Sequence, residues 1–456
     1  MKRTSPLVLL LSMACAAGAA PAGPASANPA APLPSWVVTN SLPATNTIVF
    51  DEFLGEVAAA NLDYAAQRYN VDIAKAAVAI AKEFPNPTLN LNGSKDVRYW
   101  NRKLPDSSGR LVSQSMAEPA GVGIDQAIEY FGKRKWRIRA AGHAYRAAAA
   151  TLEDFLRNLK LDASEAFVEA LATEQTLEQE RKAADYLAQL VVAQRHRLAA
   201  GDIGETDLTQ SRVDELQLQN DLLNAQNDAQ TAQLALSAFL GRDRGQTTLI
   251  PRGKLDSEPR VFDLSRLIFQ ALQNRSDLVA LRHARDGADS GIHLAKASRV
   301  PDVDVGLSYT YTSGSDNFVA PAQPDSMVGL SLSVPLPLWN RQRAEIATAK
   351  FNARQAEAML QSAELKAEVN VRQTFSSYEI MQQRVRKFQG ELLKGAEEVL
   401  AAKRFSYEHG QATLLELLDA QRADNDVHQS YNDALADAAK ALIELERAAG
   451  LWDVRF

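Results

Sequence analysis

The sequence predicts a mainly α-helical protein whose chain also contributes four β-strands to a transmembrane β-barrel. Three observations support this fold class. The architecture is repeated within the chain, each repeat holds a pair of alternating segments about ten residues long, and each holds a long helical stretch that reverses at a glycine. Apolar residues make up 46% of the 456 residues but aromatic residues only 7%, a composition typical of long alanine-rich helices.

The first 27 residues have the pattern of a secretory signal peptide. A basic start, Met1-Lys2-Arg3, precedes a 14-residue apolar stretch at 7–20, and Ala25-Ser26-Ala27 has the small-x-small form of a cleavage site. Lipidation of Cys15 is the alternative form of processing. Residues 28–50 are rich in proline and alanine and are predicted to form an extended lead-in. No later segment has 18 consecutive apolar residues, so the chain is predicted to enter a membrane only as strands.

An internal repeat divides the rest of the chain. Pro85-Asn86 recurs as Pro301-Asp302, and Gly201 and Gly241 recur as Gly410 and Gly450 at a constant offset of 209 residues. One architectural unit is therefore used twice. The predicted boundaries are a first repeat at 51–241, a linker at 242–262, a second repeat at 263–450 and a C-terminal tail at 451–456.

Each repeat opens with a helix that a proline ends, and a pair of strands follows. The helices are predicted at 51–82 and 263–298, and the strands at 88–100, 120–131, 302–312 and 327–338. Apolar and polar residues alternate in the strands, and about ten residues is the length of a tilted strand that crosses a bilayer. The predicted lipid-facing residues are Val305, Leu307, Tyr309, Leu330 and Leu332. Alternation alone would also fit a half-buried soluble sheet.

Long helical hairpins complete the repeats, at 132–241 and 341–450. Leucine and alanine recur at three or four residues, as in a coiled-coil seam, and the first arm of each hairpin would extend about 100 Å. The arms reverse at Gly201 and Gly410, because a sharp turn needs a residue that accepts positive φ. The two halves are not separate domains, since four strands cannot close a barrel and neither hairpin can bury both faces.

Composition and motifs exclude several classes of function. Lys and Arg number 50 and Asp and Glu 56, and this net charge of -6 without a basic block argues against a nucleic-acid partner. A single cysteine and six scattered histidines, none paired four residues apart, predict no metal site and no disulfide framework. The P-loop, HExxH and GxSxG motifs are absent, so neither an enzyme nor a cofactor is expected.

Six segments together resemble one known family. They are FPNPTLNLN and VPDVDVGLS at the strands, GKRKWRIRAA and SVPLPLWNRQRAEIATA before the long helices, and RLAAGDIGETDLTQSR and FSYEHGQATLLELLDAQR at the turns. The chain resembles the TolC-like outer-membrane efflux proteins over nearly all of its mature length, and the GKR and PLPLWNR junctions resemble the heavy-metal, Czc-type branch.

The resemblance implies an architecture and a set of partners. It implies a homotrimer with a twelve-stranded barrel in outer-membrane lipid and a periplasmic α-barrel, located in the Gram-negative outer membrane. It also implies a periplasmic adaptor (membrane fusion protein) and an inner-membrane resistance-nodulation-division (RND) pump as partners. The residues expected at the adaptor-docking tips are Gly201, Asp202, Ile203, Thr206, Asp207, Gly410, Thr413 and Leu414.

The resemblance also implies a pore constriction one turn beyond the second tip. Asp207 aligns with Glu416, but Gln210 aligns with Asp419, so only the second repeat has two carboxylates three residues apart on one helix face. In a trimer, Glu416 and Asp419 would form two stacked acidic rings that attract cations.

A passive exit duct for heavy-metal cations is the predicted function. A duct of the same fold for multidrug efflux or type I protein secretion is the alternative within this class. A periplasmic coiled-coil adaptor without a pore is the alternative from another class, although an adaptor would carry one hairpin and this chain carries two.

Overall fold

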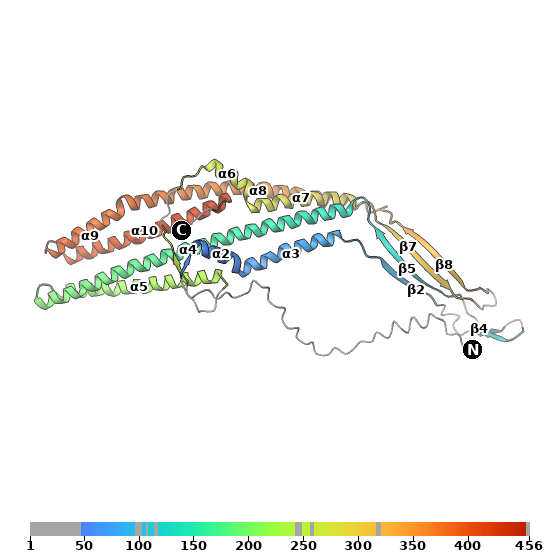
Figure 1. Cartoon of the computed structure of the whole chain (residues 1–456), viewed down its shortest axis with the longest axis horizontal. Coiled ribbons are helices and arrows are strands. Elements are labelled where there is room, and N and C mark those ends of the chain that lie inside the picture. The colour runs from blue at the N-terminus through green and yellow to red at the C-terminus, as the bar shows by residue number, and fades with distance from the viewer. Residues whose placement is uncertain are drawn as a thin grey trace. The chain divides into compact units, whose positions relative to one another are not determined.

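Two long helical hairpins make up most of the structure, a computed structural model (Figure 1). In the first, α4 (Lys133–Ala200) returns as α5 (Glu205–Phe239). In the second, α8 (Arg343–Lys387), the π-helical turn η2 (Phe388–Leu392) and α9 (Leu393–Glu408) form one arm, and α10 (Leu414–Ala449) returns. The first arm of the predicted hairpin 341–450 is therefore interrupted once, by a π-bulge with Gly390 at its centre.

The structure describes residues 47–95, 103–105, 108–113, 117–241, 249–255, 260–315 and 321–452. All of these residues belong to one compact unit, Asn46–Phe456. The predicted signal peptide, Cys15 and most of the lead-in lie outside the described residues. The end of the lead-in is β1 (Thr47–Val49), which pairs in parallel with β6 (Ile250–Arg252) in the predicted linker.

Four shorter helices replace the two predicted at the start of the repeats. They are α2 (Phe50–Ala60), α3 (Leu62–Lys82), α6 (Leu264–Asn274) and α7 (Ser276–Ala297). Each predicted helix is broken at one residue with extended backbone, Asn61 or Arg275, each with ψ of 124°. The Asn61 side chain caps α3 by accepting from the Tyr64 N–H at 2.9 Å. Arg275 donates to the carbonyl of Ala448 at 3.2 Å. The sequence gives no local signal of these breaks, because neither residue is a glycine or a proline, the residue types that usually mark a helix end.

The strands of both repeats form one antiparallel sheet in the order β2-β5-β7-β8. Their bounds are β2 (Thr88–Gly93), β5 (Pro119–Ile128), β7 (Val303–Thr312) and β8 (Asp325–Ser333). β5 and β8 end earlier than the predicted 131 and 338. Phe131 and Gly132 have positive φ, and Pro335 lacks the N–H that a longer β8 ladder would need. A small hairpin of β3 (Lys103–Pro105) and β4 (Leu111–Ser113) lies between the first two predicted strands.

The register of the sheet separates an apolar face from a polar one. One row across the four strands consists of Leu89, Ile124, Leu307 and Leu330, and these side chains are between 53% and 80% exposed. The adjacent row on the same face consists of Leu91, Val122, Tyr309 and Val328. The intervening row on the opposite face consists of Asn90, Gly123, Ser308 and Gly329.

The predicted lipid-facing residues all lie on the apolar face. Val305 pairs with Leu332, and Leu307 pairs with Leu330. Val305 is half-buried, whereas Leu332 is 71% exposed. The isolated chain thus presents an apolar sheet face that its own helices leave largely uncovered.

The main hydrophobic core lies among the helices, away from this sheet. Phe167 of α4 is fully buried and lies with its ring centroid 5.4 Å from that of Phe50 and 5.6 Å from that of Phe53. Leu236 of α5 and Ile443 of α10 are fully buried in the same cluster. Residues from both repeats thus share one core. Within the part of the chain that the structure describes, no helix has both the length and the apolar character needed to cross a membrane.

Candidate functional site

The turn of the first hairpin joins α4 to α5. Its predicted tip residues are Gly201, Asp202, Ile203, Thr206 and Asp207. Gly201 ends α4 with φ of 82°, the left-handed conformation that the sequence predicts there. The Asp202 N–H donates to the carbonyl of Arg197 at 2.9 Å, which closes the end of the helix. Thr206 and Asp207 lie in the first turn of α5, where the helix dipole favours a carboxylate.

The turn of the second hairpin is built in the same way around Gly410, whose φ is 72°. The Gln411 N–H donates to the carbonyl of Ser406 at 2.8 Å, and the Thr413 hydroxyl caps α10 by accepting from the Glu416 N–H at 3.3 Å. Leu414, expected at the docking tip, is only 9% exposed because it packs against Leu187 of α4. The sequence gives no signal of this contact, because Leu187 and Leu414 belong to different hairpins.

The two predicted constriction carboxylates differ in their surroundings. Glu416 accepts a hydrogen bond from the Lys403 ammonium at 2.6 Å, across the hairpin from α9. This bond and the charge of Lys403 lower the pKa of Glu416, so the carboxylate is ionised and its charge is balanced within the same chain. Asp419 has a more exposed side chain, 62%, and lies 3.8 Å from Arg422. Asp419 is thus the more open of the two acids.

An acid-lined groove of about 470 Å³ lies between the two hairpins, behind these tips. The carboxylates that line it are Glu180, Asp214, Asp221, Asp228 and Asp426. Arg422 of α10 pairs with the buried Asp214 of α5, which ties the second hairpin to the first. Burial, followed by the charges of Asp221 and Asp426, raises the pKa of Glu180. The sequence did not single out this groove, because its acids come from three helices.

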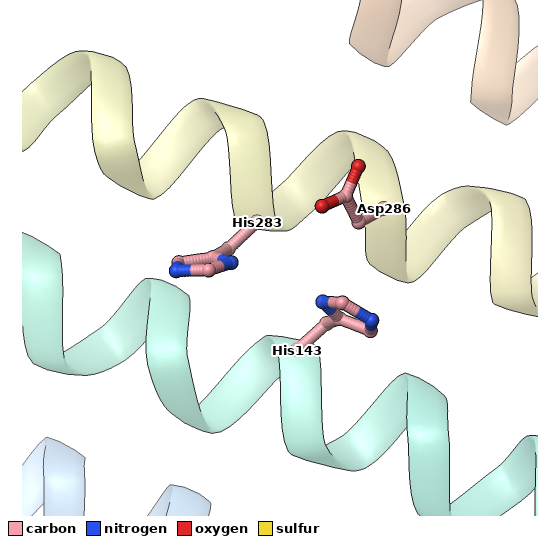
Figure 2. A group of neighbouring side chains, drawn as sticks. All are labelled: His143, His283 and Asp286. Carbon is pink, nitrogen blue, oxygen red and sulfur yellow. The ribbon is translucent and has the colours of Figure 1, made fainter. Parts of the chain in front are cut away.

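The structure also brings together two histidines that the sequence left as isolated residues. His143 of α4 and His283 of α7 lie side by side, and Asp286 lies one turn from His283 (Figure 2). Nitrogen and oxygen atoms from the three side chains all lie within 4.8 Å of one another. The two histidines are 140 positions apart, so a search for pairs within one helix could not find them.

The sequence matches the family described as "Outer membrane efflux protein" over residues 53–242 and 267–451. It is 23% identical over 407 residues to the cobalt-zinc-cadmium resistance protein CzcC of Cupriavidus metallidurans, covering 89% of this chain and 91% of that protein. It is also 23% identical over 394 residues to the outer membrane protein TolC of Vibrio cholerae, covering 85% of this chain and 87% of TolC.

A solved structure shares the fold. A crystal structure of CusC matches with a TM-score of 0.70 at 18% identity, over 93% of this chain and 98% of that one. The predicted membership of the TolC-like family with likeness to the Czc-type branch, the mainly helical fold of the chain and the predicted outer-membrane location are confirmed. The chain therefore belongs to the outer membrane efflux protein family and is an efflux channel of the outer membrane.

Proposed function

We propose that three copies of this chain form a passive exit duct for heavy-metal cations, acting with a periplasmic adaptor and an RND pump. The four-stranded sheet is the observation that supports a trimer. β2 and β8 each have one neighbour among the four strands, so within the described residues both outer edges of the sheet lack a pairing strand. A hydrocarbon environment leaves no water to satisfy such edges, and three copies of four strands would pair every edge in a ring of twelve.

The choice of cargo rests on relatives and on charge. CzcC is named for resistance to cobalt, zinc and cadmium, and CusC of Escherichia coli is named as part of a cation efflux system. The open carboxylate of Asp419 near the second tip suits cations at an entrance. One relative favours an organic substrate instead. The fusaric acid resistance protein FusA of Burkholderia cepacia is 23% identical over 308 residues, covering 67% of this chain and 58% of FusA. Multidrug efflux is therefore the second candidate.

Metal export is tested by deleting the gene from its host and restoring it. We expect the deletion to lower the tolerated concentrations of Co²⁺, Zn²⁺ and Cd²⁺ severalfold, with restoration by the wild-type chain and little change in tolerance to fusaric acid. The opposite pattern, sensitivity to fusaric acid with unchanged metal tolerance, would assign the channel to organic substrates.

If the sheet inserts into the membrane as part of a barrel, arginine substitutions on the two faces of β7 should have unequal effects on trimer yield. Leu307→Arg or, on β8, Leu332→Arg should cost about 2–4 kcal/mol per protomer, because the charge would face lipid near mid-membrane. Ser308→Arg is the matched control, since Ser308 is the next residue of β7 and lies on the opposite, polar face. Trimer yield in isolated outer membranes measures the effect. Equal yields for the Leu307 and Ser308 variants would reject the assignment of faces.

We also propose that the turns around Gly201 and Gly410 dock the adaptor. Ile203, Thr206 and Thr413 are the positions to substitute with bulky residues, and Ile203→Trp leaves the cap of α10 intact because that cap is Thr413. We expect normal trimers but loss of export and of crosslinking to the adaptor. Val261→Trp, at a position 98% exposed outside both turns, is the control. Wild-type crosslinking by the Ile203 variant would contradict this role.

The two acids at the second tip are proposed to select cations at the pore constriction. Glu416→Gln combined with Asp419→Asn should reduce cation preference in planar-bilayer recordings, with normal trimer yield. Lys403→Gln should act in the opposite direction, because it removes the ammonium that balances Glu416. Wild-type selectivity in the double variant would exclude these carboxylates as the filter.

A further inference from the structure

The closest grouping of metal-binding side chains in the described part of the structure lies between α4 and α7. α7 approaches α4 closely at this level, since a Cβ placed on Gly287 would lie 3.4 Å from the Cβ of His143. His143 therefore meets the face of α7 that carries His283 and Asp286 (Figure 2). Three residues from two helices thus present two imidazoles and one carboxylate to a common point.

The histidines have unused donor or acceptor atoms at this point. The Nδ1 atoms of His143 and His283 are both buried and have no hydrogen-bond partner among the residues that the structure describes. Buried polar nitrogens are normally satisfied by a protein group, a water or an ion, and no described protein group does so here. The imidazole rings are tilted by 43° with centroids 6.1 Å apart, so they do not stack on each other. An ion between them would satisfy both nitrogens at once.

We propose that His143, His283 and Asp286 form a binding site for a borderline divalent cation such as Zn²⁺ or Co²⁺. Imidazole nitrogen with a carboxylate oxygen is a ligand set that these ions accept, and three protein ligands leave a fourth position for water. Bonds of about 2.1 Å in a tetrahedron bring donors to about 3.4 Å from one another. The donors here lie within 4.8 Å, so side-chain rotation within the existing helices closes the site.

The charged groups around the site influence how tightly it binds a cation. Arg285 pairs with Asp286 at 2.8 Å, and Glu357 of α8 lies 3.9 Å from Arg285. The positive charges of Arg285 and Arg146 oppose the binding of a cation at this point.

Co²⁺ titration of the purified full chain, freed of metal with a chelator, tests the site. The visible d–d bands of Co²⁺ report coordination by nitrogen and oxygen. We expect one Co²⁺ per chain, displaced by Zn²⁺, and affinity lower by about tenfold or more in His143→Ala and in His283→Gln. Asp286→Asn should weaken binding as well. The matched controls are His196→Ala and Asp289→Asn, exposed residues of the same two helices, which should bind as wild type does.

Far-UV circular dichroism of each variant separates loss of the site from loss of the helices. A wild-type chain without d–d bands, or folded His143 and His283 variants with wild-type affinity, would overturn the proposal. Binding to purified protein does not depend on which substrate the channel exports, so the site and the metal-export proposal can fail independently.

Discussion

Backbone hydrogen bonding at the two outer edges of the four-stranded sheet is the constraint on which the proposed assembly depends. β5 and β7 are paired on both sides, whereas in the part of the chain that the structure describes β2 and β8 are paired on one side only. In hydrocarbon each unpaired peptide group costs several kcal/mol, far more than an exposed leucine in water. The apolar face adds a second demand, since Leu307 and Leu330 are exposed in the isolated chain. Pairing with strands of other copies would satisfy the sheet edges, and lipid would cover the apolar face.

The internal repeat extends to contacts that hold the hairpins in place. Asn61 donates to the carbonyl of Phe239 at the end of α5, and Arg275 donates to that of Ala448 near the end of α10. Gly241 and Gly450, both with positive φ, approach the same two breaks so closely that a Cβ would lie 3.3 Å from the Ala60 carbonyl and 3.5 Å from the Arg275 nitrogen. Each repeat thus fastens its own hairpin to the break in its first helix, by different side chains at equivalent places.

Local patterns in the sequence predicted the strands, helices and turns. Most features that the sequence did not predict depend on contacts between distant segments. Alternation predicted the apolar face of β7 and β8, and glycine predicted both turns, because these features depend on neighbouring residues. The breaks at Asn61 and Arg275 depend on hairpin ends more than 170 residues away. The partner of Glu416 was missed for a similar reason. Lys403 lies on the other arm of the hairpin, and spacing along one helix does not show it.

Two kinds of acidic group in this chain fit different demands of the proposed export of cations. A group that draws ions into an opening must release them, so it is best exposed and only partly neutralised, as Asp419 is beside Arg422. A group that holds an ion needs further donor atoms beside it and partial burial, as Asp286 has with His143 and His283. The proposed ion at α4 and α7 would join the helix that leaves β5 to the helix that enters β7. Because those strands pair with each other, such an ion would brace the junction between sheet and helices.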